Sequence, residues 1–502
     1  MLCYDSMKNT PSENEARLQA ALDAQIKLNQ QLQFTLEKLQ QQMDNLLRIL
    51  YGKKSEKTKK EEAVADAEAA LPEIAHEITK STTQATNKQQ PKRQFLPEHL
   101  PREKIKYELL ESERTCQHCG TLCHMMGKEI TEQLEYIPAH LYVKQHIRYK
   151  YVCRHGCCVK IVPLPAQPID KGIPGPGLLA DVLVSKYQDA MPLYRQTLRF
   201  KRYNMELSDS TLCDWVMQSA TLLEPIVIAM KNNLLDHVKI HTDDTTVPVL
   251  AKGKTKTGRM WVYVADGSCG YKSTIYDYTP TRSQEGPKKF LGNFKGFLQA
   301  DAYSGYDVIY KDGHVIEIGC MAHVRRKFFE VSQAAAGDTI ADDILKKIAK
   351  IYDIERKIRG HDQQKRFFYR KKHSKPLYHE LYRWLIKNQK LTLNKTPIQQ
   401  AINYALNHWR ALTNVFRDGR LEVDNNTAER AIKPVVIGRK NYLFAGSNEG
   451  ARKAAIIYSL IETCKQNNLN TFEYLRDVLT RLPSHKANKI NELLPYHWQA
   501  SA

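Results

Sequence analysis

Apolar residues recur at a regular spacing through the first fifty residues of the chain. Within residues 12–52 they alternate in steps of four and three, a spacing typical of a coiled coil. The seam consists of Leu18, Leu22, Gln25, Asn29, Leu32, Leu36, Leu39, Met43, Leu46 and Leu50. Asn29 falls at an a position, where a buried amide fixes the register and favours dimers. We therefore expect a leucine-zipper-like coiled coil that joins chains into a homo-oligomer; the alternative is one amphipathic helix packed on the rest of the protein.

This pattern ends at residue 53. Residues 53–105 carry few large apolar side chains and many charges, which predicts a flexible linker. After the Pro/Gly-rich stretch GIPGPG, residues 172–235 have the apolar spacing of helices, and the tail 451–502 predicts further short helices. The chain of 502 residues is therefore expected to fold as several domains.

A helix-turn-helix is one interpretation of the segment 172–235. Residues 192–202 and 209–217 predict two helices joined by a short turn. In a DNA-binding helix-turn-helix the second helix enters the major groove. A purely structural helical hairpin has the same sequence pattern, so both interpretations remain open.

Strand-like apolar runs replace the helical pattern between residues 236 and 330. The five runs are HVKIHTDDTTVPVL, GRMWVYVAD, YKSTIYDYT, GFLQAD and VIEIGCM. A helical stretch, SQEGPKKFLGNF, lies between the third and the fourth. The predicted order is three strands, then a helix, a strand, a helix, a strand and a helix. This is the element order of the ribonuclease-H-like fold. We predict a multidomain α/β protein whose ribonuclease-H-like core spans 236–450 and contains a basic, aromatic helical insertion at about 338–418.

Cysteines cluster between residues 114 and 160. Cys116 and Cys119 form a CxxC pair, and Cys153 and Cys157 supply the second pair that a tetrahedral structural zinc site needs. The second pair is irregular, so the fourth ligand is open; the other candidates are His118, Cys123, His124, His155 and Cys158. We expect a zinc-binding module over 114–160, against the alternative of ordinary reduced cysteines.

Charge indicates the partner. The chain has 75 Lys and Arg residues against 55 Asp and Glu residues, a formal net charge of +20, which favours a polyanion such as DNA. No apolar run approaches the roughly 18 residues of a membrane span, and the N-terminus lacks the layout of a signal peptide. We therefore expect a cytoplasmic protein with no membrane partner, in which the 11 cysteines are thiols or metal ligands.

Three acidic residues are candidates for a catalytic site. Asp243 and Asp301 lie at the ends of the first and fourth predicted strands, and Glu429 opens a helical stretch. Converging carboxylates are what a two-metal phosphoryl-transfer site requires, with Mg²⁺ or Mn²⁺ as the ion. Two choices remain open on chemistry alone: Asp243 against Asp244, because strand neighbours face opposite sides, and Glu429 against Glu330, which is closer in sequence to Asp301.

Basic residues flank these acids and are candidates for contacts with DNA phosphates. The candidates are Arg325, Arg326, Arg430, Lys433, Arg439 and Lys440. Aromatic residues of the insertion either stack on unpaired bases or belong to a core; they are Phe367, Phe368, Tyr369 and Trp409.

Along nearly its whole length the chain resembles the transposases of the insertion-sequence-66 family, of the DDE type. The motifs that carry the resemblance are LLRILYGKKSEK, LPEHLPRE, CQHCG, DDTTVPVL, GRMWVYVAD, LQADAYSGYD, CMAHVRRKFFE, NNTAERAIKPVVIGRKNYLFAGSNEGARKAAIIYSLIETCKQNNLN and ELLPYHW. Relatives carry Asp-Glu-Thr where this chain has Asp243-Asp244-Thr245, a departure that spares the first acid. The resemblance thus implies Asp243 as the first acid and Glu429 as the third.

The resemblance also implies an activity. A bacterial, nucleoid-associated enzyme would cut the terminal inverted repeats of its element and join the freed ends to target DNA, with small companion proteins of the same element as partners. Two other functions remain open: a ribonuclease-H-like nuclease or resolvase that cuts without joining, and a DNA-binding regulator without catalysis. The sequence alone does not choose between copying and excision.

Overall fold

The computed structural model describes most of the chain beyond residue 140, namely residues 141–147, 149–152, 159–161, 165–170, 172–268, 270–334 and 339–500. The chain divides into two compact units, one of Met1–Ser55 with Arg148–Ala502 and the other of Glu56–Ile147. The predicted coiled coil, the linker and all four predicted zinc ligands lie outside the described residues. Near the last two of these cysteines, β1 (Lys150–Val152) pairs with β2 (Val159–Ile161) as an antiparallel hairpin.

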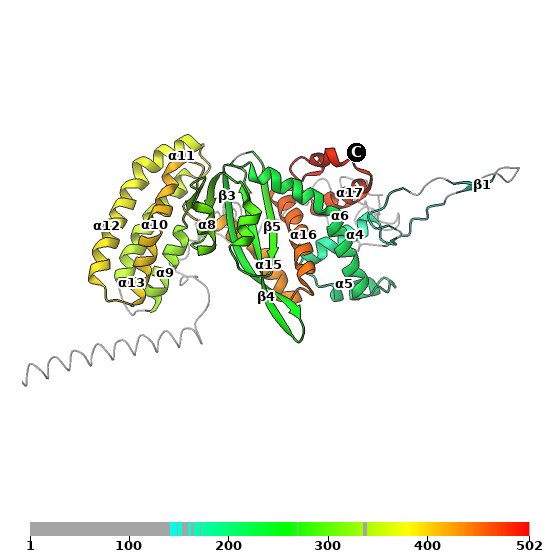
Figure 1. Cartoon of the computed structure of the whole chain (residues 1–502), viewed down its shortest axis with the longest axis horizontal. Helices are drawn as coiled ribbons and strands as arrows, with labels where there is room; N and C mark the ends of the chain where they lie inside the picture. Colours follow the sequence, from blue (N-terminus) through cyan, green and yellow to red (C-terminus); the bar gives the residue numbers. More distant parts are fainter. Residues whose placement is uncertain are drawn as a thin grey trace, which may run out of the picture. The chain divides into compact units, whose positions relative to one another are not determined.

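A five-stranded mixed sheet lies at the centre of the larger unit, with strand order β5-β4-β3-β6-β7 (Figure 1). The antiparallel strands are β3 (Lys239–Ala251), β4 (Lys254–Asp266) and β5 (Lys272–Thr279). The short strands β6 (Gly296–Gln299) and β7 (Val315–Ile318) run parallel to β3. The connecting elements are α7 (Glu285–Leu291), η3 (Ser304–Tyr306), α8 (Asp307–Tyr310) and, after β7, α9 (Met321–Ala334). This order confirms the predicted ribonuclease-H-like core.

Helices from both ends of the larger unit pack around the sheet. Those before it are α4 (Pro176–Tyr187), α5 (Leu193–Lys201) and α6 (Asp209–Leu235). Those after it are α15 (Asn426–Tyr442), α16 (Asn448–Gln466), α17 (Thr471–Arg481), η6 (Leu482–Ser484) and η7 (Ala487–Leu493). They share one apolar core with the sheet, because β4 is buried from Met260 to Ala265 and needs cover on both faces.

Helix α16 covers the edge strand of the sheet. Ser459 Oγ accepts a hydrogen bond from the N–H of Tyr276 at 2.8 Å, and Thr463 Oγ1 accepts one from the N–H of Thr274 at 3.0 Å. Thr463 Oγ1 in turn lies 3.0 Å from the carbonyl of Thr274, to which it can donate. An uncovered edge strand presents unpaired backbone groups to solvent. Two hydroxyl side chains of α16 therefore satisfy β5 where a sixth strand would otherwise pair.

Helix α6 has the length and mean hydropathy of a membrane-spanning helix, contrary to the expectation from apolar run length. Its apolar residues Leu212, Ala220, Leu223 and Ile226 are fully buried in the core that α6 shares with the sheet and α16. A core helix meets the same criteria of length and composition. The burial therefore accounts for its hydropathy without a membrane. The two helices predicted at 192–202 and 209–217 are α5 and the first part of α6; whether they bind DNA stays a prediction.

A bundle of helices is inserted between α9 and α15, as predicted. Its elements are α10 (Ile340–Ile358), α11 (Gln363–Tyr369), the π-helix η4 (Arg370–Ser374), α12 (Lys375–Leu391), α13 (Pro397–Asn407), α14 (Trp409–Thr413) and η5 (Asn414–Arg417). The bundle has a core of its own, which it shares with α9 and with Ile318 of β7. Trp409 packs on Tyr378 and Tyr382 as a core aromatic, whereas the side chain of Phe368 is 66% exposed.

Candidate active site

Asp243 and Asp244 of β3 face opposite sides of the strand. The Asp244 carboxylate is 1% exposed and accepts hydrogen bonds from Arg259 Nη1 at 2.9 Å and Arg282 Nη2 at 2.8 Å. Asp243 Oδ1 accepts only the N–H of Asp244, at 2.8 Å, among the bonds recorded for the described residues. Asp243 also lines a pocket that Asp244 does not reach. Asp244 therefore has a structural pairing, and Asp243 is the acid that faces open space.

Asp301 follows β6, the parallel neighbour of β3. The register of β3 and β6 ends at the pair His241 and Gln299, and Asp243 and Asp301 each follow two residues later in the sequence. Parallel neighbours lie about 4.8 Å apart and paired residues face the same side. Asp301 Oδ1 accepts the N–H of Tyr303 at 3.3 Å, and Asp301 Oδ2 lies 3.6 Å from Arg282. The charge of Asp301 helps to raise the pKa of Asp243, so the strand pairing brings the two carboxylates near each other where β6 ends.

Glu429 reaches the same place from the first turn of α15. Glu429 Oε1 is buried without a hydrogen-bond partner in the described part of the protein and lies 3.9 Å from His323 Nδ1, which has no hydrogen-bond partner there either. Glu429 Oε2 lies 3.7 Å from Arg326 Nη2. A pocket of about 520 Å³ lies between β3, α9 and α15, lined by Asp243, His323, Arg326, Glu429, Ile432, Lys433, Val436 and Ile437. The rival acid Glu330 does not line this pocket.

The three acids are electrostatically coupled. Burial, followed by the charges of Asp301, Asp244 and Glu429, raises the pKa of Asp243 to about 7. Burial also raises the pKa of Asp301, against the opposing effect of Arg282. Burial lowers the pKa of His323, which favours its neutral imidazole. Close carboxylates of this kind repel one another unless a cation lies among them.

The donor atoms suit a hard divalent cation. Carboxylate oxygens are the ligands that Mg²⁺ and Mn²⁺ prefer, and the unpartnered Glu429 Oε1 provides one without breaking a hydrogen bond. His323 offers a nitrogen beside Glu429, and Cys320 completes a group of three potential ligands. However, burial raises the pKa of Cys320 to about 12, which disfavours the thiolate that a metal requires. The residues present therefore fit an oxygen-liganded ion.

The segment 418–425 places Glu429 against the sheet. Asn425 Nδ2 donates to the carbonyl of Thr242 at 2.8 Å, and Asn425 Oδ1 lies 3.2 Å from His241 Nδ1. Gln299 Nε2, at the end of β6, donates to the carbonyls of Glu422 at 2.7 Å and Asp424 at 2.9 Å. The residues that precede Asp243 and Asp301 in their strands therefore also bind the segment that leads into α15.

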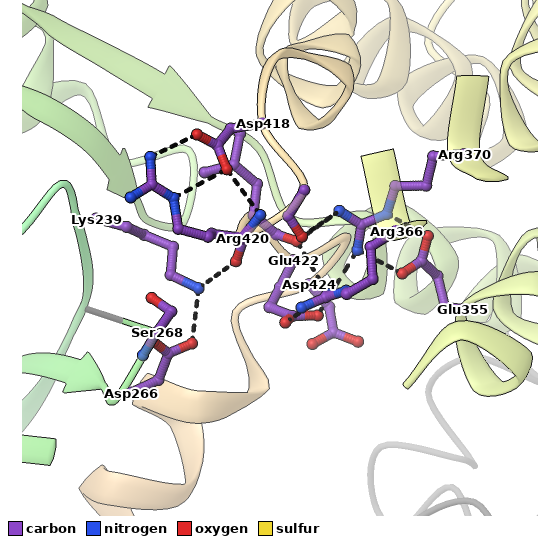
Figure 2. Close-up of polar contacts among 12 residues, drawn as sticks. Lys239, Asp266, Ser268, Glu355, Arg366, Arg370, Asp418, Arg420, Glu422 and Asp424 are labelled. Atoms are coloured by element: carbon purple, nitrogen blue, oxygen red, sulfur yellow. Dashed lines mark hydrogen bonds and ion pairs between the residues drawn. The ribbon is translucent and has the colours of Figure 1, made fainter. Parts of the chain in front are cut away.

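Charged side chains hold the same segment from two sides (Figure 2). From β3, Lys239 Nζ donates to Asp266 Oδ2 at 2.6 Å and to the carbonyl of Arg420 at 2.5 Å. From the helical insertion, Arg366 Nη2 donates to Glu422 Oε1 at 2.7 Å.

Arg370 forms the most deeply buried of these contacts. Its Nε and Nη2 donate to the two oxygens of Glu355 at 2.8 and 2.6 Å, and its Nη1 donates to the carbonyl of Leu421 at 2.7 Å (Figure 2). Sequence analysis did not find this network, because its partners are separated by 15 to 181 residues and no local pattern links them.

The predicted DNA-binding residues differ in their surroundings. Arg326, Arg430, Lys433 and Lys440 are exposed, and Arg325 is half-buried. Arg439 Nη1 donates to Thr245 Oγ1 at 3.0 Å and to Thr246 Oγ1 at 2.9 Å, so it holds α15 against β3. Their contact with DNA stays a prediction, and for Arg439 it would compete with this structural role.

Metal-free protein provides a test of the two neighbouring aspartates. At pH 8 in EDTA, we expect Asp243→Asn to raise the free energy of unfolding by about 1–3 kcal/mol, because it removes a charge that burial and neighbouring acids disfavour. Asp244→Asn should lower it by about 1–3 kcal/mol by weakening two ion pairs.

The expected pH dependence has a definite sign. The pKa of Asp243 is about 7 in the folded protein and near 4 in an unfolded chain, so its stabilising effect is present below pH 4 and is lost as pH rises through 7. The gain from Asp243→Asn should therefore disappear at pH 4. Thermal melts at both pH values measure this, and a gain that is equal at both would contradict the coupling of the acids.

Comparison with known proteins gives consistent results along the chain. Residues 171–453 match a family model described as transposase IS66 family, and residues 459–496 match the IS66 C-terminal element. Residues 113–158 match the zinc-finger binding domain of transposase IS66, and residues 38–105 match a model described as transposase C of IS166 homeodomain.

Full-length relatives are found in Sinorhizobium fredii. The uncharacterized protein y4hP is 33% identical over 494 residues, covering 92% of this chain and 89% of the relative. The uncharacterized protein y4qI is 30% identical over 522 residues, covering 99% of this chain and 96% of the relative. These matches extend across the sheet, the insertion and the segment that carries Glu429.

Proposed function

Because the chain belongs to the IS66 family of DDE transposases, we propose that it cuts the ends of its own insertion sequence and joins them to target DNA at Asp243, Asp301 and Glu429. The observation that supports this most is the convergence of three carboxylates from β3, from the residues after β6 and from α15, two of which line a pocket together with Arg326 and Lys433. Three carboxylates that converge from separate elements can hold the two divalent ions of a two-metal phosphoryl-transfer site.

Asp243, Asp301 and Glu429 would hold two divalent ions, Mg²⁺ or Mn²⁺, which when bound activate the attacking oxygen and stabilise the leaving oxygen. Arg282 holds Asp244 and approaches Asp301, so it orients the acids on the sheet. Arg326 and Lys433 line the pocket and would bind the phosphates that flank the reacting one. Arg430, exposed beside Glu429, would bind the same strand.

The reaction has two steps in this proposal. Water first attacks the phosphodiester at the element end, so that one P–O bond forms, another breaks, and a 3′-hydroxyl is freed. That hydroxyl then attacks a phosphodiester of target DNA, forming the new junction and releasing a 3′-hydroxyl from the target. The second step exchanges one phosphodiester for another and needs no external energy source.

The remaining parts of the chain have supporting roles in this proposal. The leucine-zipper-like segment would join chains so that two element ends are held together, and the zinc-finger module would bind DNA or small companion proteins of the element. With these roles, the protein would act on nucleoid DNA in the cytoplasm.

The decisive experiment uses DNA that flanks the gene as substrate for the full-length protein. With Mg²⁺ or Mn²⁺ we expect cleavage at the element ends and joining to a target plasmid, and with Ca²⁺ or EDTA neither product. Cutting without joining would instead favour the nuclease or resolvase alternative. Binding without cutting under every metal condition would favour the regulator without catalysis.

Removal of zinc should impair binding to element ends much more than it impairs the cleavage reaction. We expect a zinc-specific chelator, or Cys116→Ser, to release about one zinc ion per chain and to weaken specific binding to element ends. Cleavage of DNA added in excess, with Mg²⁺ present, should fall much less, because the acidic site has oxygen ligands. Metal analysis, binding titrations and cleavage rates measure this; cleavage that is lost as steeply as end binding would contradict it.

A further inference from the structure

A turn of rare geometry follows α15. Leu443 has φ 66° and ψ −50°, and the N–H of Phe444 donates to the carbonyl of Tyr442 at 2.8 Å. These values describe a γ-turn of the strained form, which is rare, and a leucine at its centre adds a steric cost. Strained non-glycine residues persist where the surrounding structure holds them, and they cluster at functional sites.

The turn is held rigidly on β3. The N–H of Leu250 donates to the carbonyl of Ala445 at 2.8 Å, and the N–H of Ala445 donates to the carbonyl of Pro248 at 2.9 Å. The N–H of Leu443 donates to the carbonyl of Arg439 at 2.8 Å, and the Arg439 guanidinium is bonded to β3. The strain is therefore imposed by contacts on both sides of the turn.

The side chains of the strained turn and of the residue after it are apolar and exposed to solvent. Leu443 is 65% exposed and Phe444 is 40% exposed. Two further apolar residues nearby are also exposed: Leu250, which is bonded to Ala445, and Ile437, two turns earlier on α15. The backbone of the turn is bonded to β3, but the exposed parts of the Leu443 and Phe444 side chains bury no apolar surface within the described part of the protein. We call Leu443 and Phe444 the apolar wedge.

Basic residues connect the apolar wedge with the acidic site. Glu429, Lys433, Ile437 and Lys440 follow one another at steps of four, four and three, and so lie on one face of α15. The strand β3, to which the turn is bonded, extends with β4 beyond the rest of the sheet as a hairpin (Figure 1). The exposed residues Lys252, Lys254 and Lys256 lie at or next to the turn of this hairpin. Helical rise places the wedge about 20 Å from Glu429 along α15.

We propose that the apolar wedge inserts between stacked bases of duplex DNA, with Lys433, Lys440 and the hairpin lysines bound to the adjoining phosphates. The proposal rests on the proposed function, because it takes the strand that the acids cut as the one that the wedge opens. Apolar side chains inserted at a base step unstack it and kink the duplex. At 3.4 Å per base pair, the opened step would lie about six base pairs from the reacting phosphodiester.

The lysines favour DNA over a second copy of this chain as the occupant. A second copy also carries a net charge of +20, and would bring like charges to a surface already flanked by lysines. A phosphate backbone supplies the opposite charge, and the bases supply apolar faces that match leucine and phenylalanine.

The test compares Leu443→Gly and Phe444→Ala with wild type. Glycine adopts a positive φ readily, so Leu443→Gly removes the side chain and relieves strain without endangering the fold. Leu391→Ala is the matched control, because Leu391 at the end of α12 is 68% exposed and lies outside the proposed surface. Each protein is bound to duplexes from the DNA flanking the gene in Ca²⁺, so that no strand is cut. The complexes are then treated with permanganate, which oxidises unstacked thymines. Cleavage rates in Mg²⁺ are then measured on intact duplexes and on duplexes with a mismatch at the reactive step.

The expected result is a reactive thymine step with wild type and Leu391→Ala that both wedge variants lose. The wedge variants should cut intact duplex at least about tenfold more slowly, and mismatched duplex at the wild-type rate, because the mismatch removes the unstacking cost. Equal reactivity and equal rates for all proteins would overturn the proposal. The proposal would also be overturned if the wedge variants cut mismatched duplex as slowly as intact duplex and had a changed oligomeric state without DNA. That result would mean that the surface is an interface between copies of the chain. Permanganate reactivity without cutting by any protein would overturn the proposed function and leave the wedge standing.

Discussion

Asp301→Asn and Glu429→Gln are each expected to reduce Mg²⁺-dependent cleavage of element ends on the order of 1,000-fold or more, with the fold intact. Each change keeps the size of the side chain and removes a charge that a divalent ion needs. The position of Asp301 beside Asp243 and the unpartnered oxygen of Glu429 are the structural reasons. Cleavage and strand-transfer rates on flanking DNA measure the effect, and thermal melts check the fold.

Glu330→Gln is the matched control for this prediction. Glu330 is an exposed acid of α9, on the same helix as His323, and does not line the pocket. We expect it to retain cleavage within about twofold of wild type, since exposed charges contribute little. If Glu330→Gln were inactive while Glu429→Gln cut normally, the third acid would be misassigned and the role given to α15 would be wrong.

In the same variants, the affinity for DNA should be kept although the cleavage rate is lost. Loss of negative charge beside Arg326 and Lys433 does not remove any phosphate contact, so affinity for DNA in EDTA should be unchanged or higher for Glu429→Gln. A fall in affinity that matches the fall in cleavage would show that the acid acts through the structure of the DNA-binding surface rather than through a metal ion.

The order of the strands along the chain could be predicted from the sequence, because each strand is a separate apolar run with its own boundaries. The choice between Asp243 and Asp244 does not follow from the residue pattern and was implied only by the family resemblance, since the pairing of Asp244 depends on Arg259 from β4 and on Arg282 after β5, which come near β3 only in the folded sheet. Apolar periodicity locates a strand but does not say which of two adjacent acids is paired.

The third acid was a harder problem for a similar reason. Glu429 reaches the sheet because the segment 418–425 returns the chain from the insertion to β3 and β6. Most of the bonds that hold this segment use backbone carbonyls as acceptors, and a carbonyl is present at every residue, so it leaves no pattern in the sequence. The γ-turn at Leu443 is equally hidden, because leucine has no preference for positive φ and only tertiary contacts impose it.

Arg370→Met is expected to lower the free energy of unfolding by about 3–5 kcal/mol. The Arg370 side chain is 1% exposed and that of Glu355 is 8% exposed, so the substitution leaves a buried carboxylate without its partner. It also removes the donor to the carbonyl of Leu421. Chemical denaturation followed by intrinsic fluorescence measures the loss.

The double variant Arg370→Met/Glu355→Met distinguishes stability from the positioning of the active site. Replacing both members of a buried ion pair by apolar residues of similar size is often neutral, so most of the lost stability should return. Activity should not return with it, because the carbonyl of Leu421 has lost the 2.7 Å hydrogen bond from Arg370 and keeps the longer one, at 3.2 Å, from Arg366. The segment that leads to Glu429 is then held from β3, β6, Met321 of α9 and Arg366.

We expect the double variant to cut element ends about 10-fold more slowly than wild type at saturating Mg²⁺. Arg356→Met is a suitable control, since Arg356 pairs with Asp353 at the exposed surface of the same helix α10 and surface pairs contribute little. Full activity in the restabilised double variant would mean that Arg370 is not needed to position Glu429, because the contacts from β3, β6, α9 and Arg366 suffice. The buried pair of Arg370 and Glu355 would then serve the stability of the helical insertion, and Arg366 would be the remaining contact from the insertion to test for a part in holding the third acid.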